Sequence, residues 1–482
     1  MNWKAILNLT GVVILIMTAF MLLPIGVSIV AKSGDTLPLT YSFLISLLAG
    51  GSLFLLTGVG PKKDIRHRDG FVVVTIGWLL VTLFGSLPFL FSGTFSSFTD
   101  AYFEAMAGFT TTGASVLTAI EGTPAGILFW RSLTQWLGGM GIVLFSLAIL
   151  PMLGGGGMQL FKAEVPEITI DKLRPRLVDT AKSLWYIYTS LTLLAAVLFY
   201  FGGMNIFDAI CHAFTTLATG GFSTKNTSLA FFNSPFIDGV ATVFMFLAGI
   251  NYTIYFYAFR GDFSRFARSD EFRFYVRVTL VAILLVTLNI WKSDYNSIFE
   301  ALRYSSLQVV SIMTTTGFAT ADYEKWSPFA QMALVTLMFF GGMIGSTGGG
   351  MKQVRIMLMF RQVYRELYHL IHPRAVTVIK LDTKHVPKEI LGSIWGFVFL
   401  FIIIWVTATL LLTAQGIDLV TSASTVISAL CNVGPALGTA GPAENYASLQ
   451  VAAKWVLIFC MLVGRLEVYT VVVLFMPKFW EK

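Results

Sequence analysis

Long apolar stretches alternate with short polar segments along the whole 482-residue chain. Eight uncharged stretches exceed the roughly 20 apolar residues that cross a bilayer as a helix, at 5–31, 39–61, 70–99, 132–161, 183–207, 239–259, 326–351 and 390–417. Residues 278–291 and 446–477 are two further candidates, the second interrupted by charge. The pattern therefore predicts about ten membrane-spanning helices.

Four short runs, about 100 residues apart, each lie between two of these apolar stretches. Their sequences are TTTG at 110–113, ATGG at 218–221, TTTG at 314–317 and CNVG at 431–434. Each run is typical of a short helix that ends in an extended backbone with a terminal glycine. Repetition at this interval indicates a repeated unit. Four such units predict a ring of backbone carbonyls, the device with which cation-selective pores replace an ion's water.

A second landmark follows each run and supports the repeat. Glycine-containing triplets occur in the same order at 138–140, 248–250, 341–343 and 463–465. The first two units align without gaps at an offset of 108 residues, and the pore segments of units three and four are expected to be about one helical turn longer. We expect an all-α polytopic membrane protein, in which two leading helices (1–61) precede four helix–pore loop–helix units around one ion pore, at 62–161, 162–260, 261–374 and 375–482.

Glycine suits the end of each run because a carbonyl ring requires backbone conformations that a Cβ would obstruct. The preceding helix would direct its negative C-terminal end at the cavity, which favours a cation there. The alternative interpretation is that each Thr-Gly pair only caps a helix. Four sites in the same register favour the ring.

The glycine-rich segment 341–352 interrupts the last helix of unit three. Six glycines occur in its first ten residues, and each lowers helix stability by about 1 kcal/mol. We interpret the segment as a mobile intramembrane gate held by few backbone hydrogen bonds, formed by Gly345, Ser346, Thr347, Gly348, Gly349 and Gly350. The alternative is close glycine packing between helices.

Arg465 lies near the middle of the last apolar stretch, with Glu467 two residues on. An ionisable residue inside the membrane indicates function, and we expect Arg465 to belong to the gate and to face the pore below the ring. There its positive charge would slow cations. The alternative is a buried pair with Glu467, although residues two apart point in different directions on a straight helix.

Basic residues are concentrated on one side of the predicted helices. Of the 33 Lys and Arg, 25 lie in four loops and near the two ends, and seven lie in the alternate loops. This asymmetry predicts that both termini are cytoplasmic. The opposite side carries 12 Asp and Glu, an acidic mouth that would concentrate cations. The net charge of +7 therefore reflects the inner membrane face and does not indicate nucleic-acid binding.

With these features the chain resembles the Trk/Ktr/HKT superfamily of potassium transporters over nearly its whole length. The resemblance implies a homodimer in the bacterial inner membrane, one potassium pathway per protomer, and a cytosolic nucleotide-binding regulator of the TrkA type. The amphipathic run 355–374 would extend as a helix into the cytoplasm, where the surrounding basic segment could dock such a partner.

The resemblance also implies the residues of a potassium selectivity filter, which are Thr111, Thr112, Gly113, Thr219, Gly220, Gly221, Thr315, Thr316, Gly317, Asn432, Val433 and Gly434. Potassium would be held at Thr111, Thr112, Thr219, Gly220, Thr315, Thr316, Asn432 and Val433. Two adjacent glycines leave the register of unit two open by one residue, and unit four replaces Thr-Thr with Asn-Val. Sodium-preferring relatives carry serine at the first filter glycine, so Gly113 implies a preference for potassium.

Two other function classes compete with a regulated potassium pathway. A proton- or sodium-coupled secondary transporter would place Asp, Glu or His in its helices as a relay, whereas the expected inventory at membrane depth is close to Glu467 alone. A membrane enzyme would need a clustered nucleophile, carboxylate pair or metal site. Five scattered histidines and three cysteines in apolar or pore-proximal segments form no such motif. We therefore expect no enzymatic activity and no bound cofactor, with potassium as the substrate.

Overall fold

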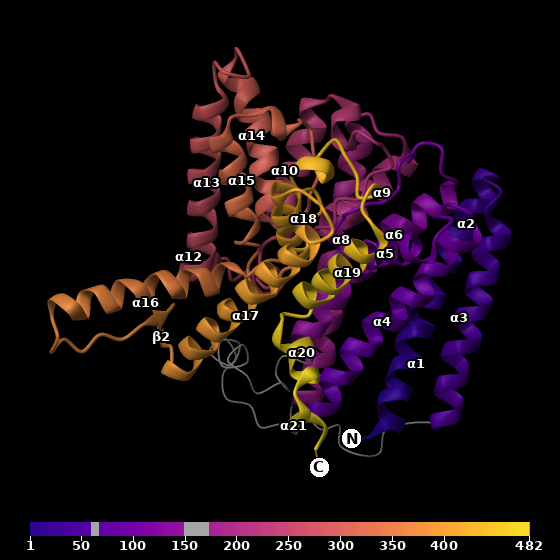
Figure 1. Cartoon of the computed structure of the whole chain (residues 1–482), viewed down its shortest axis with the longest axis horizontal. Helices are drawn as coiled ribbons and strands as arrows, with labels where there is room; N and C mark the ends of the chain where they lie inside the picture. The colour runs from indigo at the N-terminus through magenta and orange to yellow at the C-terminus, as the bar shows by residue number, and fades with distance from the viewer. Residues whose placement is uncertain (59–66, 149–172, 482) are drawn as a thin grey trace.

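The computed structural model describes residues 1–58, 67–148 and 173–481, and almost all of its regular structure is helical (Figure 1). The expected unit boundaries at 61/62 and 161/162 lie outside the described residues. Ahead of the repeats, α1 (Trp3–Phe20) and α2 (Leu22–Ala31) form one apolar segment of 29 residues, and α3 (Thr36–Thr57) returns across the same layer.

Each of the four repeated units contains a pore helix between two other helices, and the helix before it is always longer. Unit one has α4 (His67–Phe91), α5 (Phe98–Phe109) and α6 (Ala125–Ala148); unit two has α8 (Leu173–Phe201), α9 (Ile206–Leu217), α10 (Pro235–Ala248) and α11 (Tyr252–Ala258). Unit three has α13 (Asp270–Ile290), α14 (Ile298–Met313), α15 (Pro328–Met338) and α16 (Gln353–Ile371); unit four has α17 (Lys388–Thr413), α18 (Leu419–Cys431), α19 (Val451–Arg465) and α20 (Tyr469–Val472). Shorter elements lie between or after these helices: α12 (Ser264–Arg268), α21 (Pro477–Trp480), η3 (Ser228–Phe232), η4 (Tyr323–Lys325), η5 (Gly438–Ala440), η6 (Val473–Phe475), β1 (Lys380–Leu381) and β2 (Lys384–His385).

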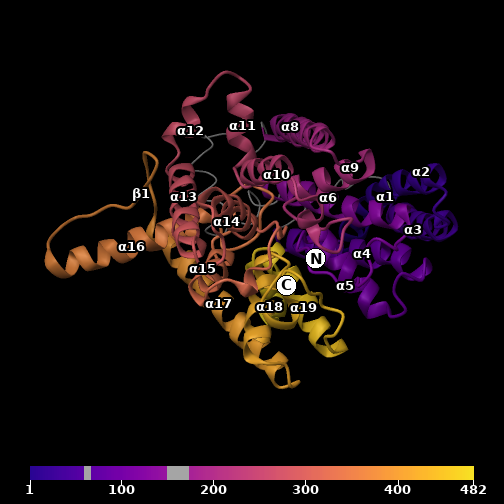
Figure 2. The same ribbon diagram turned by 90° about the horizontal axis from the view of Figure 1, so that it is seen from above.

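The described helices confirm the predicted membrane class. Six are long and apolar enough to cross a bilayer, and two further pairs qualify as single spans bent by 95° (α10–α11) and 110° (α19–α20). The 24-residue α6 and the interrupted segment from α15 to α16 occupy the positions of the other two expected spans. Figure 2 shows the four units around a common centre, with α1–α3 outside them.

The four pore helices are buried toward their C-terminal ends. In α5 every residue from Ala101 to Phe109 is buried, whereas the spans expose apolar side chains outward, including Leu48 and Leu56 of α3. This contrast is expected where long helices face lipid and shorter ones, with irregular ends, are tolerated at membrane depth only inside protein.

The pore helices differ less in length than the sequence predicted. They contain 12, 12, 16 and 13 residues in units one to four. The longer helix in unit three is confirmed, but the prediction of an extra turn in unit four is wrong. Asp418 caps the N-terminus of α18, whereas Asp100 of α5 and Asp208 of α9 lie inside the first helical turn.

The second glycine landmark marks close contact with the pore helices. A Cβ on Gly138 would lie 2.1 Å from the Phe109 carbonyl oxygen, and one on Gly464 would lie 1.9 Å from that of Leu430. The interruption of the last helix falls at this landmark in unit two, begins just before it in unit three and just after it in unit four, whereas α6 continues through it. Both termini lie at one end of the molecule, and α16 projects sideways from the body, followed by the β1–β2 hairpin (Figure 1).

Candidate functional site

The backbone has the same conformation at the end of all four pore helices. Left-handed φ angles of 52°, 52°, 62° and 57° occur at Thr111, Thr219, Thr315 and Asn432. Two residues later φ is 77°, 75°, 81° and 103° at Gly113, Gly221, Gly317 and Gly434. The repeat settles the register of unit two, because Gly221 rather than Gly220 occupies the left-handed position. We call the segments 111–113, 219–221, 315–317 and 432–434 the filter segments.

The amide groups of the filter segments turn back onto their own helices. In unit one the Thr112 amide donates to Ala107 O at 2.8 Å, and in unit two the Gly220 amide donates to Thr215 O at 2.9 Å. In units three and four the equivalent bonds, to Ser311 O and Ser428 O, are 2.8 and 2.9 Å long. The helix C-termini thus satisfy the filter amides locally.

Each filter glycine contacts the carbonyl oxygen of the neighbouring filter segment. A Cβ added to Gly113 would lie 2.0 Å from Gly220 O, and one added to Gly221 would lie 1.9 Å from Thr316 O. A Cβ on Gly317 would lie 2.1 Å from Val433 O, and one on Gly434 would lie 2.6 Å from Thr112 O. These contacts run from unit one to two, three, four and back to one. They define the carbonyl ring, made of the carbonyls of Thr112, Gly220, Thr316 and Val433.

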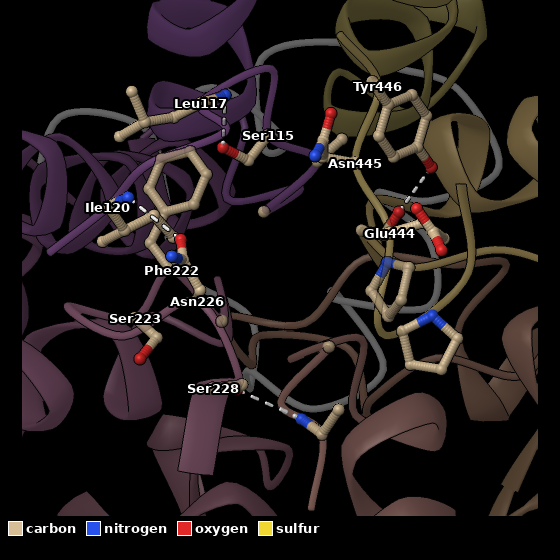
Figure 3. Close-up of a pocket in the computed structure, with 18 of the residues that line it drawn as sticks. Ser115, Leu117, Ile120, Phe222, Ser223, Asn226, Ser228, Glu444, Asn445 and Tyr446 are labelled. Atoms are coloured by element: carbon tan, nitrogen blue, oxygen red, sulfur yellow. Dashed lines mark hydrogen bonds between the residues drawn. The ribbon is translucent and has the colours of Figure 1, made fainter. Parts of the chain in front are cut away.

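An outer cavity of about 230 Å³ opens on one side of the carbonyl ring, and all four filter glycines line it. Figure 3 shows Ser115 and Phe222 on one side of the opening, with Glu444 and Tyr446 on the other. The Tyr446 hydroxyl donates to Gly434 O at 2.5 Å. The wall of this cavity is drawn from all four units, and units one, two and four contribute polar side chains to it.

A buried ion pair supports the cavity wall, and sequence reasoning missed it. The Arg131 Nε lies 2.6 Å from Glu104 Oε1, and both side chains are almost fully buried. Arg131 also donates to Ser223 O at 2.8 Å, while Glu104 accepts from the Val116 amide at 2.9 Å. The expectation that Glu467 would be nearly the only acid at membrane depth is therefore wrong. A Glu in the middle of a predicted pore helix was the available signal.

A second carboxylate joins units three and four outside the membrane-spanning helices. Glu324 accepts a hydrogen bond from the Gly438 amide, and the neighbouring Tyr323 hydroxyl donates to Ala436 O at 3.0 Å. Partial burial is the largest influence on Glu324 and raises its pKa above the ordinary value. The segment that follows the unit-four filter is thus tied to unit three.

The segment 341–352, which we call the glycine loop, lies against the opposite side of the carbonyl ring. The Gly349 amide donates to the Thr315 hydroxyl at 2.7 Å, and the Gly350 amide donates to Cys431 O at 3.0 Å. The Thr347 hydroxyl donates to Leu217 O at 3.0 Å. The loop therefore contacts the C-terminal ends of three pore helices, beneath the filter. The predicted gate residues are brought together at this place.

Arg465 binds the glycine loop and does not pair with Glu467. Its guanidinium donates to Thr347 O at 2.8 Å and to Gly138 O at 3.0 Å. Glu467 instead pairs with Arg355 at 2.5 Å, because the chain breaks after α19 and turns through positive φ at Glu467 and Val468. The alternative of an Arg465–Glu467 pair is excluded by this geometry.

The expectation that few backbone hydrogen bonds hold the glycine loop is wrong. Its amides at Met343 and Met351 donate to Gly249 O at 2.9 Å and Phe339 O at 3.0 Å, and Gly345 O accepts from the Tyr252 amide at 3.1 Å. The Lys352 ammonium donates to Gly348 O. The loop is irregular but well bonded, and its partners come from several units.

Comparison with known proteins agrees with this geometry. A profile of the family described as "TrkH: Cation transport protein" matches residues 39–482. The chain is 40% identical to the "Trk system potassium uptake protein TrkH" of Salmonella typhimurium and of Escherichia coli K12, over the full length of this chain and of each relative. Its fold matches the crystal structure of the potassium transporter TrkH from Vibrio parahaemolyticus with a TM-score of 0.92 and 38% identity, covering all of both chains.

The likeness extends over the leading helices and all four units, so it includes the elements that build the carbonyl ring and the glycine loop. The chain belongs to the TrkH family of cation transport proteins.

Proposed function

We propose that this protein takes up potassium across the bacterial inner membrane through the carbonyl ring. The observation that carries the proposal is the closed cycle of contacts between each filter glycine and the next carbonyl. Four carbonyls on one ring can replace part of the hydration shell of a cation. The relatives are named as potassium uptake proteins, which supports potassium as the ion.

The electrostatics of the site favour a cation, although no negatively charged side chain belongs to the ring. The four pore helices direct their C-terminal ends toward the filter segments, and such ends carry a partial negative charge. Among the charged groups that line the outer cavity, Arg131 pairs with Glu104 and Lys225 lies 3.4 Å from Asp208, while Glu444 adds a carboxylate to the wall. Potassium would bind at Thr111, Thr112, Thr219, Gly220, Thr315, Thr316, Asn432 and Val433.

We propose further that the glycine loop closes the pathway beneath the ring, with Arg465 as its latch. The loop lies under the filter and bonds to three pore helices. Opening would require these bonds to be exchanged, and a regulator must therefore bind the open state more tightly than the closed one. The regulator would be a cytosolic nucleotide-binding protein of the TrkA type, acting on a homodimer whose termini face the cytoplasm.

The projecting helix α16 offers a route for that regulation. It begins directly after the glycine loop, and Arg355 in its first turn is paired with Glu467. A force on α16 would therefore act on both the loop and the turn after α19. Coupled transport is the alternative, but the buried Glu104 and the half-buried Glu467 are each ion-paired with arginine, which does not favour a proton relay.

Flux through proteoliposomes containing the purified protein tests the proposal. Rubidium uptake should be inhibited by potassium at far lower concentration than by sodium, and the regulator with its nucleotide should change the rate. Equal inhibition by the two ions would contradict potassium selectivity. Uptake that requires a proton or sodium gradient of fixed sign would establish coupled transport instead.

A further inference from the structure

One of the four residues that supply the ring carbonyls, Gly220 in unit two, has no side chain to restrict its backbone. In units one, three and four the residue that supplies the ring carbonyl carries a β-branched side chain, namely Thr112, Thr316 and Val433. Thr112 Oγ1 is 2.7 Å from Thr110 Oγ1, and Thr316 Oγ1 is 2.9 Å from Thr314 Oγ1. Branched side chains restrict their own backbone, whereas two consecutive glycines leave it free.

Gln135 of α6 fills the place of the missing side chain. A Cβ built on Gly220 would lie 2.3 Å from Gln135 Cδ and 2.4 Å from its Oε1. The Gln135 side chain is completely buried. Unit one thus lends a side chain to the filter segment of unit two.

The Gln135 amide clamps the two-glycine segment at both ends. Its Nε2 donates to the ring carbonyl Gly220 O at 2.6 Å, and its Oε1 accepts from the Phe222 amide at 3.0 Å. The two bonds span Gly221 and fix the orientation of the peptide that carries the ring oxygen. Asn432 also donates a side-chain hydrogen bond to the filter segment of another unit, but its acceptor is the Thr112 hydroxyl rather than a ring carbonyl.

We propose that Gln135 is a positioning residue for ion selection, acting through the Gly220 carbonyl. Selection between ions of different radius requires that the coordinating oxygens keep their number and orientation. Without the clamp the Gly220–Gly221 peptide can rotate, and the ring then offers three oriented carbonyls in place of four. The inference deepens the proposed function and rests on it.

Inhibition of rubidium uptake by sodium and by potassium, measured on the full-length protein, tests this role. We define the selectivity ratio as the sodium concentration that halves uptake divided by the potassium concentration that does so. Gln135→Ala is expected to lower the ratio about tenfold, a change of roughly 1.4 kcal/mol. Adding Gly220→Thr to Gln135→Ala should restore the ratio, because the space is then free for a Cβ and unit two regains the Thr-Thr-Gly sequence of units one and three. Gly220→Thr alone should not fold well, since its side chain would overlap Gln135.

Gln308→Ala is the matched control, because Gln308 is also fully buried and its amide donates to Ala321 O at 3.2 Å, away from the ring. It should lower thermal stability and leave the ratio within twofold of the wild type. If Gln135→Ala does not yield folded protein, the variant that combines Gln135→Ala with Gly220→Thr tests the role of Gln135. A folded double variant with the wild-type ratio supports the proposal, and one that is unfolded or unselective overturns it.

The outcomes separate this inference from the proposed function. A wild-type protein that does not distinguish potassium from sodium would overturn the proposed function. A selective wild type together with an equally selective Gln135→Ala would overturn only the role of Gln135.

Discussion

The carbonyl ring and the glycine loop are both glycine-rich and buried, yet they are held in opposite ways. In the ring, each filter segment bonds its amides to its own pore helix, and the units are joined by the glycine-to-carbonyl contacts and by side-chain hydrogen bonds of Gln135 and Asn432. In the loop, amides and carbonyls bond to other segments, among them Gly249, Tyr252 and Cys431. The filter segments keep one geometry because their backbone hydrogen bonds lie within one helix end. The glycine loop can change its position when the other segments to which it is bonded move.

The two regions also differ in charge. The filter segments contain no ionisable side chain. The loop is held by two cations, since Arg465 donates to Thr347 O and Lys352 donates to Gly348 O. This difference leads us to assign ion selection to the ring and control of passage to the loop. Variants of one region should then leave the property of the other unchanged.

Deleting residues 345–350 should have the largest effect. If about 1% of the protein is open without the regulator, removing the gate raises regulator-independent flux by up to roughly 100-fold. Potassium flux with and without the partner and nucleotide measures this. The potassium-to-sodium ratio should stay near that of the wild type. A deletion variant that inserts and dimerises but keeps the normal dependence on the partner would exclude the loop as the gate.

Gly113→Ser should lower selectivity by up to roughly 30-fold, because a non-glycine residue at a left-handed φ costs about 1–3 kcal/mol and the chain relieves this strain by moving the backbone that carries the ring. The new Cβ would also lie 2.0 Å from Gly220 O, so the ring must open at this contact and admit sodium. Gly122→Ser is the control, since its Cβ would be 4.0 Å from its nearest neighbour, Ala119 O. An unchanged sodium inhibition in Gly113→Ser would remove Gly113 from the filter.

Arg465→Ala should raise regulator-independent flux about tenfold, because the one bond from its guanidinium to the loop, at Thr347 O, is lost. A hydrogen bond from a charged donor contributes roughly 1.5–3 kcal/mol, and the low end of this range corresponds to about tenfold. Arg465→Lys keeps the charge but cannot reproduce the planar fork that bridges Thr347 O and Gly138 O. An intermediate flux in Arg465→Lys would show that both charge and bridging matter. Wild-type flux in a folded Arg465→Ala would rule out the latch.

The smallest effect is expected at the outer end of a pore helix. Asp418 accepts from the Thr421 amide at 2.9 Å, and Asp418→Ala should lower the unfolding free energy by about 1 kcal/mol. Hydrogen bonding with Thr421, through its side chain and backbone, depresses the Asp418 pKa below the ordinary 3.8. The carboxylate therefore stabilises the fold above pH 3.8, and this contribution is lost as the pH falls through the folded-state pKa.

Thermal unfolding from pH 3 to 7 checks this last prediction. The melting temperatures of wild type and Asp418→Ala should differ at neutral pH and converge in acid. A difference that grows in acid would contradict the assignment. The selectivity ratio should not change, because Asp418 lies at the far end of α18 from the ring.

Sequence alone predicted the parts of the site that local chemistry dictates. The filter glycines stood out because the left-handed backbone favours glycine, and the loop stood out because six glycines destabilise a helix. The register of unit two could not be predicted, since both Gly220 and Gly221 tolerate the required φ. The positive φ of Gly221, which matches that of Gly113, Gly317 and Gly434, assigns Gly221 to the filter position.

The supports behind the ring could not be predicted because they depend on tertiary contacts. Gln135 lies 85 residues from Gly220 along the chain, and nothing in its local sequence indicates the partner. The break after Arg465 was missed for a different reason. Positive φ at Glu467 and at the β-branched Val468 is unusual for these residue types, so no turn signal marks the site.

The location of a bound rubidium ion tests the central claim most directly. Anomalous diffraction from crystals grown in rubidium, compared with crystals in sodium, places the ion without reference to any variant. The account predicts a rubidium peak on the axis of the ring, between the carbonyls of Thr112, Gly220, Thr316 and Val433, and no equivalent site in sodium. A ring that stays empty in rubidium, with the ion bound elsewhere in the chain, would contradict it.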